Sequence, residues 1–366
     1  MRREAPDLFK GVIMKSLIFL STEPYSGKTG LAVNMVLELR ERGYTVGFFK
    51  PVGNLPDRTD STINDKDALF AKRVLGLKEP AEDICPLLLT SSETKRRLAE
   101  GTDGAAAKVK DAYERTLAGK DMLVLEGCGH INDGRLYGAS GVEVAQFLDA
   151  KAVLVVKLDN PYEIVDDVLV AADRLGDRLA GVVFNWVSAA AQSVLEELVE
   201  PYLAKQGIVS FGMIPRDESL LAVSVSHLAK ALGGRVLCAD EHGRDMVETF
   251  MVGAMGQEQA LRFFRRKAKK AVITGGDRTD VQLAALETQT TCLVLTGNYM
   301  PPATVLAVAE SKGVPVVLVD MDTLTAVERT ESLIGHMRVH DEDRLRVMRE
   351  RMDKYLDIDG LCEAAG

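Results

Sequence analysis

The sequence predicts an α/β protein built on a doubly wound parallel sheet, followed by a second, smaller α/β domain. Short apolar or β-branched runs alternate with helical patterns along most of the chain. Runs such as AVLVV and MLVL are apolar throughout, which is typical of parallel strands that are buried on both faces. The alternation begins again after GMIPRDESL, which indicates a second domain.

The first domain is predicted to hold six strands joined by helices through right-handed crossovers. The strands are expected near 16–21, 45–50, 122–126, 152–157, 180–185 and 208–213. The helices are expected near 28–42, 65–76, 105–118, 141–148, 161–175 and 189–205.

The second domain is predicted from four strand-like runs, GRVLCAD, KAVITGG, TCLVLTG and VPVVLVD. PPATVLAVAESKG reads as a helix because proline opens it and glycine ends it. We therefore expect a leader at 1–13, with Met14 as an alternative start, a first domain at 14–220 and a second at 221–335. The charged segment 336–366 is interpreted as a C-terminal helical tail that contacts another subunit, which predicts a homo-oligomer.

Composition narrows the function classes. Hydrophobic residues make up 46% and charged residues 27% of the 366 residues, which is typical of a globular protein with sizeable cores. The net charge of -9 argues against nucleic-acid or anionic-membrane partners, and no apolar run approaches the ~20 residues of a membrane span. Five cysteines without a CxxC pair indicate reduced thiols in a cytoplasmic protein.

The strongest motif is TEPYSGKT, from Thr22 to Thr29, between the first strand and the first helix. It has the length of a phosphate-binding loop, but Thr22 replaces the first glycine. Ser26 and Gly27 would line an anion cradle of backbone N–H groups. Lys28 would add a positive charge, and the Thr29 hydroxyl would ligate magnesium. An ordinary strand-to-helix turn is the alternative, but the position favours binding of ATP and Mg²⁺.

Four further polar positions follow predicted strands or open a helix, at the edge where open α/β sheets bind ligands. They are Lys50, Asp65 or Asp67, Glu126 and Asn185. Glu126 suits a magnesium carboxylate, and the Asn185 amide could read a base edge. Each could also be a solvated strand end, a helix-start charge or a turn residue. Their convergence beside the loop favours a joint site.

STEPYSGKT, FFKPVG, DKDA and LEGCG follow the order and spacing of the dethiobiotin synthetase family. VITGGDRTDVQLAAL is similar to the DRTGG domain that follows such a module in long phosphotransacetylases. Over roughly residues 14–335 the chain therefore resembles the N-terminal portion of phosphotransacetylases. The paired order of the two domains is more specific than either motif.

The resemblance implies roles at the matching positions. Lys28 and Thr29 would hold phosphate and magnesium, and Asp67 and Glu126 would complete the magnesium shell. Asp65 is the alternative to Asp67. Together these residues imply a Mg-ATP site.

The resemblance also assigns Lys50 to the neighbourhood of the substrate, as a catalytic partner of Lys28, and Asn185 to the base. The chain departs from the family after the glutamate, where Cys128 and His130 stand. Cys128 is a redox-sensitive thiol or a small buried hydrophobe, and the second interpretation is favoured. His130 is a proton-transfer group or simply a polar loop residue.

TGGDRTD supports two interpretations. Gly275, Gly276 and Arg278 could bind an anion at the start of a helix. Alternatively, the glycines make the turn, Thr279 caps the helix and Arg278 pairs with a carboxylate.

Two functions follow, of which we favour the first. A regulatory protein would bind Mg-ATP in the first domain and a small metabolite or a partner, such as a phosphotransacetylase, through the second. An ATP-dependent ligase would phosphorylate a carboxylate or carbamate, with Lys28, Lys50 and Mg²⁺ neutralising charge. A scaffold with a vestigial loop is a weaker third. Phosphotransacetylase catalytic domains lie beyond the DRTGG domain, and this chain ends at Gly366, so no acetyl transfer is assigned.

Overall fold

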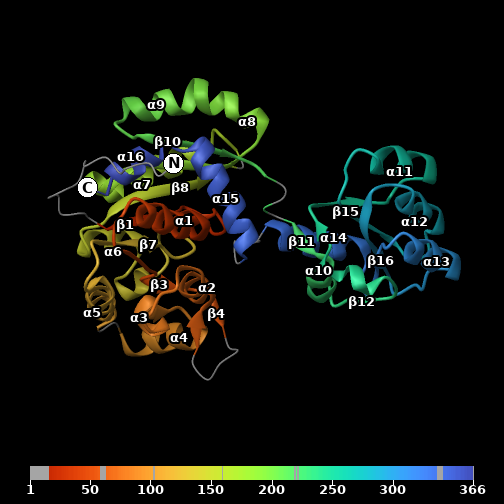
Figure 1. The fold of residues 1–366 in the computed structure, drawn as a ribbon, viewed down its shortest axis with the longest axis horizontal. Coiled ribbons are helices and arrows are strands. Elements are labelled where there is room, and N and C mark those ends of the chain that lie inside the picture. The colour runs from red at the N-terminus through yellow and green to blue at the C-terminus, as the bar shows by residue number, and fades with distance from the viewer. Residues whose placement is uncertain are drawn as a thin grey trace. The chain divides into compact units, whose positions relative to one another are not determined.

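The computed structural model describes residues 16–57, 63–101, 104–158, 160–217, 220, 222–335 and 341–365. The chain forms two compact units (Figure 1). The first unit combines Met1–Arg216 with Arg338–Gly366, and the second is Asp217–Met337. The chain thus passes from one unit to the next a few residues before the boundary expected at 220. The leader expected at 1–13, and Met14, lie outside the described residues.

The first unit is built on a six-stranded sheet of order β10-β9-β8-β1-β7-β2 in which every neighbouring pair is parallel. The chain extends this sheet from β1 in both directions, so the expected doubly wound fold is confirmed. All six predicted strands are present: β1 (Leu17–Leu20), β2 (Val46–Phe49), β7 (Met122–Glu126), β8 (Lys151–Lys157), β9 (Leu179–Val187) and β10 (Ser210–Pro215).

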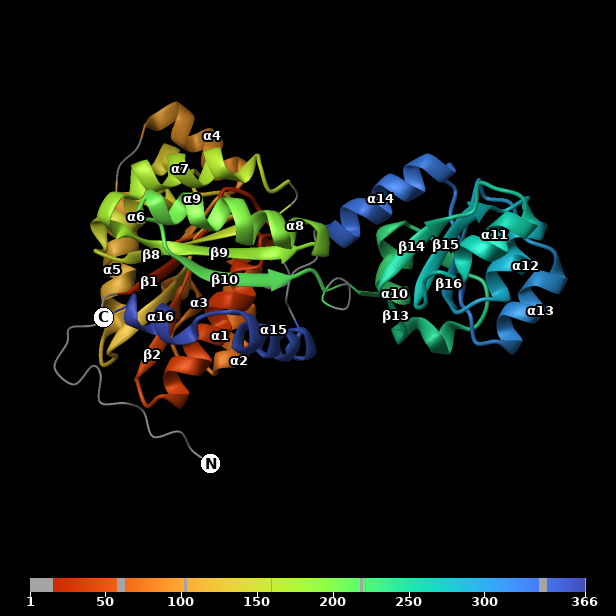
Figure 2. The same cartoon turned by 90° about the horizontal axis from the view of Figure 1, so that it is seen from above.

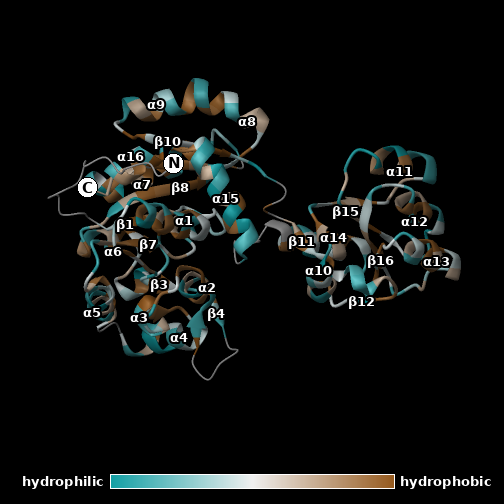
Figure 3. Ribbon diagram, in the orientation of Figure 1, coloured by the Kyte–Doolittle hydropathy of each residue, from teal (hydrophilic) through white to brown (hydrophobic). Residues whose placement is uncertain are grey.

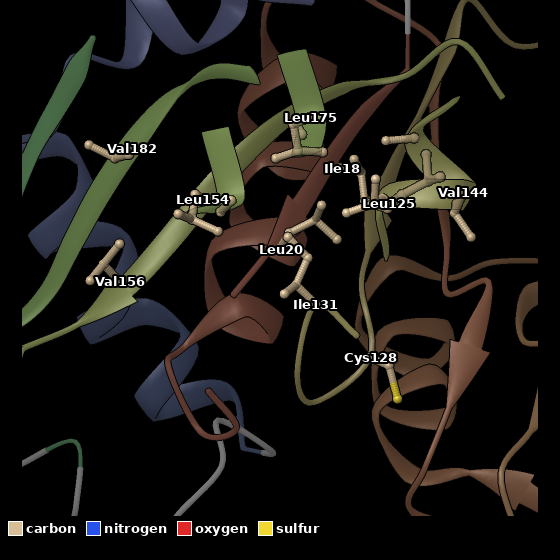
Figure 4. Close-up of a cluster of buried hydrophobic side chains, with 14 of the residues drawn as sticks. Ile18, Leu20, Leu125, Cys128, Ile131, Val144, Leu154, Val156, Leu175 and Val182 are labelled. Carbon is tan, nitrogen blue, oxygen red and sulfur yellow. The ribbon is translucent and has the colours of Figure 1, made fainter. Parts of the chain in front are cut away.

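The strands form because their side chains are apolar on both faces. Every residue of β1, β2 and β7 is buried, and Figure 3 shows the central strands as hydrophobic. One face carries Ile18, Leu125, Leu154 and Val182, which pack in a single cluster with helical side chains (Figure 4). The core of the sheet is therefore apolar, and polar residues begin at the carboxyl ends of the strands.

Helices cover both faces of this sheet (Figure 2). They are α1 (Lys28–Glu41), α2 (Lys66–Leu75), α3 (Ala81–Ile84), α4 (Ser91–Glu100), α5 (Ala105–Leu117), α6 (Gly141–Phe147), α7 (Ile164–Leu175), α8 (Ala189–Val194) and α9 (Glu200–Lys205). In the described part of the chain, no helix combines the length and the hydropathy that crossing a membrane would need.

The segment between β2 and β7 holds elements that the sequence did not predict. These are α3, α4 and two small sheets, which pair β3 (Val52–Gly53) with β6 (Leu87–Leu88) and β4 (Pro56–Asp57) with β5 (Asn64–Asp65). In α4 only Arg97 is buried, so the helix has no apolar stripe that could reveal it.

The second unit contains a five-stranded sheet of order β12-β17-β16-β15-β14. The four predicted strands are β12 (Arg235–Val236), β15 (Lys270–Gly275), β16 (Thr290–Thr296) and β17 (Val316–Leu318), with β12 antiparallel to β17. The sequence missed β14 (Thr249–Val252), an edge strand in which only Met251 is buried. The other elements are β11 (Val223–Ser224), α10 (Val225–Ala231), β13 (Met246–Val247), α11 (Gln257–Phe264), α12 (Thr279–Leu286), α13 (Ala303–Ser311) and α14 (Thr323–Gly335).

The C-terminal segment differs from the separate tail that the sequence suggested. Its helices, α15 (Glu342–Tyr355) and α16 (Ile358–Glu363), belong to the first unit. Figures 1 and 2 show α15 beside α1, where Arg349 pairs with Glu41 at 2.6 Å. Leu356 forms an antiparallel bridge with Gly212 of β10. Part of the charge that suggested an intermolecular contact is thus used within the chain, and the homo-oligomer stays a prediction.

Gly212 provides a test of this docking. Its φ is +113°, and a Cβ there would lie 2.3 Å from the Tyr355 carbonyl oxygen. We expect Gly207→Ala, where φ is +77° and no atom lies within 4 Å, to cost about 1 kcal/mol from backbone strain. Gly212→Ala should cost roughly 1–3 kcal/mol more because of the clash.

Urea unfolding followed by the fluorescence of the single tryptophan, Trp186, measures this difference in the first unit. Equal losses in the two variants would contradict the observed docking of the C-terminal segment on β10.

Candidate functional site

The loop after β1 has the geometry of an anion cradle. Gly27 stands at the N-cap of α1 with φ at +95°, and Tyr25 also has a positive φ, +57°. Thr22 is not among the residues with positive φ. The position at which Thr22 replaces a glycine therefore does not need a left-handed backbone, so the substitution is compatible with the loop.

Lys28 lies over this loop. Its Nζ donates to the carbonyl oxygen of Gly129 at 2.9 Å, to Ser26 Oγ at 3.2 Å and to the Glu23 carbonyl oxygen at 3.4 Å. The side chain is buried, and these contacts hold its ammonium against the backbone of two loops, at residues 23 and 129.

Thr29 connects the loop to the neighbouring strand. Its Oγ1 donates to Oε1 of Glu126, the last residue of β7, at 2.7 Å. Oε1 also accepts from Lys50 at 3.3 Å, whereas Oε2 of the same carboxylate is buried without a hydrogen-bond partner. A buried carboxylate oxygen without a partner is unfavourable, so this site calls for a further donor or a cation.

Lys50, directly after β2, lies at the centre of a buried charge cluster. Its Nζ contacts Asp67 Oδ2 closely and lies 3.3 Å from both Asp65 Oδ1 and Glu126 Oε1. All four side chains are at most 3% exposed. One ammonium thus contacts three carboxyl groups.

The pKa shifts follow from burial and from these charges. Burial alone would lower the pKa of Lys50, but Asp67, Glu126 and Asp65 together hold it well above its usual value. Burial raises the pKa of Glu126, and the opposing charge of Lys50 does not cancel this effect. The lysine is therefore charged at neutral pH.

The structure separates the two aspartates between which the sequence could not choose. Asp65 caps α2, because its Oδ1 accepts from the backbone N–H groups of Asp67 and Ala68. Its Oδ2 accepts from the N–H of Leu55 at 3.0 Å. Both aspartates thus contact Lys50, but Asp65 also caps α2 and holds the Leu55 N–H.

A magnesium ion fits the donor set beside the loop. Thr29, Asp67 and Glu126 offer a hydroxyl and two carboxylates, and the unpartnered Oε2 of Glu126 is a vacant acceptor. Among the described residues, no three His, Cys, Asp or Glu side chains form a metal cluster by themselves. Mg²⁺ commonly binds to one or two carboxylates together with nucleotide phosphates, so phosphate oxygens would have to complete this sparse set.

Asn185, predicted to contact a base, holds the loop in this structure. Its Nδ2 donates to the Ser26 carbonyl oxygen at 2.8 Å, and its Oδ1 accepts from the N–H of Trp186 at 2.9 Å. Trp186 has φ at +66°, which is rare for a bulky residue. Lys157 Nζ and Arg216 Cζ lie 5.1 and 5.6 Å from the centroid of its ring. A base contact by Asn185 stays a prediction.

Comparison with known proteins places this geometry in a family. Residues 15–224 match the AAA domain family, and residues 227–333 match the DRTGG domain. The first match covers more than half of the chain. The chain belongs to the AAA domain family.

The chain is also homologous to phosphate acetyltransferases. The enzyme of Pseudomonas putida KT2440 is 25% identical over 96% of this chain and 52% of its own length. That of Pseudomonas aeruginosa PAO1 is 24% identical over 93% and 50%. The chain thus spans about half the length of the curated relatives that it matches. An ATP-dependent dethiobiotin synthetase of Caldicellulosiruptor saccharolyticus is 25% identical over 32% of this chain and 49% of its own length. The resemblance inferred from the sequence is confirmed.

Two solved structures resemble parts of the chain. The septum site-determining protein MinD complexed with Mg-ADP, from Pyrococcus horikoshii, covers 57% of this chain and 83% of its own, at 14% identity and a TM-score of 0.34. The CBS and DRTGG domains of a Clostridium perfringens pyrophosphatase cover 39% of this chain and 70% of their own, at 16% identity and a TM-score of 0.29.

The two unusual residues after Glu126 in the AAA domain lie in different surroundings. Cys128 is buried, and burial, together with the nearby Asp133, raises the pKa of its thiol to about 12. This environment favours a small buried hydrophobe over a reactive thiolate. His130 Nδ1 accepts from the N–H of Asn132 at 3.0 Å, and the His130 N–H donates to Asp133. The histidine therefore takes part in the turn.

In the DRTGG domain, the TGGDRTD turn is held by its own contacts. Arg278 pairs with Asp280 at 3.2 Å and donates to the Met255 carbonyl oxygen at 2.9 Å. A Cβ at Gly276 would lie 2.2 Å from the Tyr299 carbonyl oxygen, which explains the glycine. Arg278, not Thr279, occupies the N-cap position of α12, without a side-chain cap bond, so the expected threonine cap is wrong. These contacts favour the structural interpretation of the turn.

Sequence reasoning missed two residues beside the loop, Trp186 and Met348. Trp186 directly follows Asn185, and its left-handed backbone could not be foreseen from residue type. Met348 lies on α15, far along the chain, yet its Cε comes within 3.6 Å of the position that a Cβ at Gly27 would take. One signal existed: within residues 30–36 of α1 every residue except Asn34 is apolar or glycine, which is typical of a helical stretch that is covered on several sides.

Removal of the Lys50 charge tests the cluster. Lys50→Met leaves Asp67 and Glu126 buried together without their cation, so the AAA domain should lose about 3–5 kcal/mol of unfolding free energy. Adding Asp67→Asn should restore part of that loss, because one of the two carboxylates becomes neutral.

Lys66→Met is the matched control, since Lys66 is the first residue of α2, the helix that carries Asp67, and is exposed. Its effect should stay within about 0.5 kcal/mol. Urea titration read by Trp186 fluorescence compares the variants. A Lys50→Met loss no larger than that of Lys66→Met would show that the cluster does not need its ammonium.

Proposed function

We propose that the chain binds Mg-ATP at the loop after β1 and acts as a regulatory protein. The proposal rests on the hydrogen bond from Thr29 to Glu126 beside the buried charge cluster. It joins the start of a helix, which attracts phosphate, to a carboxylate with an unpartnered oxygen, which attracts a metal ion. The proposed phosphate-binding residues and the proposed metal-binding residues are thus directly connected by this hydrogen bond.

In this proposal, different residues of the site bind phosphate and metal. The N–H groups at the start of α1 and the ammonium of Lys28 would bind phosphate oxygens, with Ser26 and Gly27 shaping the cradle. Thr29, Asp67 and Glu126 would hold Mg²⁺, which when bound supplies charge neutralisation to the phosphates. Thr22 completes the loop at its start.

Regulation is the role that agrees with the similarity. Nearly the whole chain aligns with phosphate acetyltransferases, but it covers only about half the length of each of these enzymes. Its second unit matches the DRTGG domain. We propose that the nucleotide state of the AAA domain governs a cytoplasmic partner enzyme of phosphotransacetylase type. The DRTGG domain would bind a small metabolite or that partner.

A ligase remains the second candidate because of Lys50. This ammonium lies at the carboxyl edge of the sheet, 3.3 Å from the carboxylate that also accepts from Thr29. A cation at that place could neutralise an acyl-phosphate or carbamoyl-phosphate formed from ATP. Dethiobiotin-synthetase-like carbon–nitrogen bond formation would then follow by attack of an amine.

Retention of labelled nucleotide tests the proposal. The full chain, incubated with radiolabelled ATP and Mg²⁺ and passed through a desalting column, should retain unconverted ATP. Lys28→Ala should weaken retention at least about tenfold, since it removes a charge-assisted contact of roughly 1.5–3 kcal/mol. Lys267→Ala, an exposed lysine of the second unit, is the matched control. Absence of retention by the unaltered chain would refute nucleotide binding.

Lys50→Ala separates the two candidate functions. Below the unfolding temperature of the variant, a regulatory protein should still retain ATP, whereas a ligase should lose turnover of ATP to ADP. Chromatographic identification of the nucleotide pools, with added carboxylate and amine substrates, measures both properties. Steady ADP formation by the unaltered chain that is lost in the variant would favour the ligase.

A further inference from the structure

Helix α15 lies outside both family matches, yet it packs beside the phosphate loop. The matches cover 15–224 and 227–333, whereas α15 spans Glu342–Tyr355. Three apolar residues on one side of the helix are buried in the first unit: Leu345, Met348 and Met352. No role in the site is implied for this helix by either match, so its position needs its own explanation.

The helix is attached to α1, the helix that begins at Lys28. Asn34 of α1 donates from Nδ2 to the Leu345 carbonyl oxygen at 3.1 Å, and both residues are buried. Farther along α15, Arg349 reaches Glu38 at 3.3 Å and Glu41 at 2.6 Å. These contacts run from the middle of α1 to its last residue, so α15 is attached along the second half of that helix.

Met348 brings α15 to the loop itself. Two side chains lie close to the position that a Cβ on Gly27 would take. This position is 2.4 Å from Asn185 Nδ2 and 3.6 Å from Met348 Cε. Asn185 also holds the preceding carbonyl group, that of Ser26, at 2.8 Å. The left-handed turn at Gly27 is thus confined by a hydrogen-bonded amide and by a packed methyl group.

We propose that α15 is a positioning element of the nucleotide site, with Met348 as the residue that keeps Gly27 in its phosphate-facing conformation. The inference rests on the proposed binding of Mg-ATP. Glycine populates many backbone conformations, so without packing the loop would spend part of its time in shapes that do not bind phosphate. The affinity for nucleotide is proportional to the fraction of molecules whose loop has the phosphate-binding conformation, so it falls when that fraction falls.

The coupling also has to operate in reverse. If docking of α15 strengthens nucleotide binding, bound nucleotide must strengthen docking of α15 by the same factor. Stronger docking of α15 in the presence of nucleotide is therefore a property that can be measured on the full chain.

Two methionine variants of the full chain test the proposal. Met348→Ala and Met352→Ala remove equally buried side chains one helical turn apart, but only Met348 approaches Gly27. We expect similar falls in unfolding temperature and about tenfold weaker Mg-ATP binding in Met348→Ala alone, equivalent to ~1.4 kcal/mol. Calorimetric titration with Mg-ATP, well below both unfolding temperatures, measures the affinities. Equal affinities in the two variants would overturn the proposal.

Hydrogen exchange on the unaltered chain gives a second test that does not depend on whether a variant folds. Mg-ATP should slow amide exchange in α15 severalfold relative to α5, which does not contact the loop region through any described bond. Unchanged exchange in α15, in a sample that demonstrably retains ATP, would also overturn the proposal. Failure of the unaltered chain to bind Mg-ATP at all would instead refute the proposed function.

Discussion

The buried ammonium of Lys50 is the interaction around which the first unit is organised. It lies after β2 and draws together carboxyl groups from the end of β7 and the start of α2. None of these groups could stay charged in the apolar interior alone, because isolated buried charges are strongly unfavourable. The dry sheet therefore ends in a polar edge whose members depend on one another, and the loop that begins α1 joins this edge through Thr29.

The loop after β1 separates two electrostatic environments. On the side of β7 and β2, three carboxyl groups contact the ammonium of Lys50. On the other side, Lys157 ends β8 and Arg216 comes just after β10, and both cations lie near the ring of Trp186 on β9. A ligand that is anionic at its centre and carries a metal ion on one side suits this division. The charge arrangement thus agrees with a metal-bound nucleotide whose phosphates lie over the loop.

The sequence was most informative where one physical signal dominated. Continuous apolar runs located all six strands of the first sheet, and a short motif located the loop. It could not choose between Asp65 and Asp67, because both lie at the start of the same helix and only the hydrogen bonds that Asp65 accepts from backbone N–H groups distinguish them. It missed α4, which lacks an apolar stripe, and β14, an edge strand in which only Met251 is buried. The contact of Met348 with Gly27 depends on tertiary packing between residues far apart, which no local pattern encodes.

The return of α15 and α16 to the first unit makes that unit discontinuous, with the DRTGG domain inserted between its two parts. During synthesis, the sheet and α1 leave the ribosome well before the residues that cover α1. A product truncated before Glu342 would therefore carry the loop motif without the contacts that α15 makes with α1.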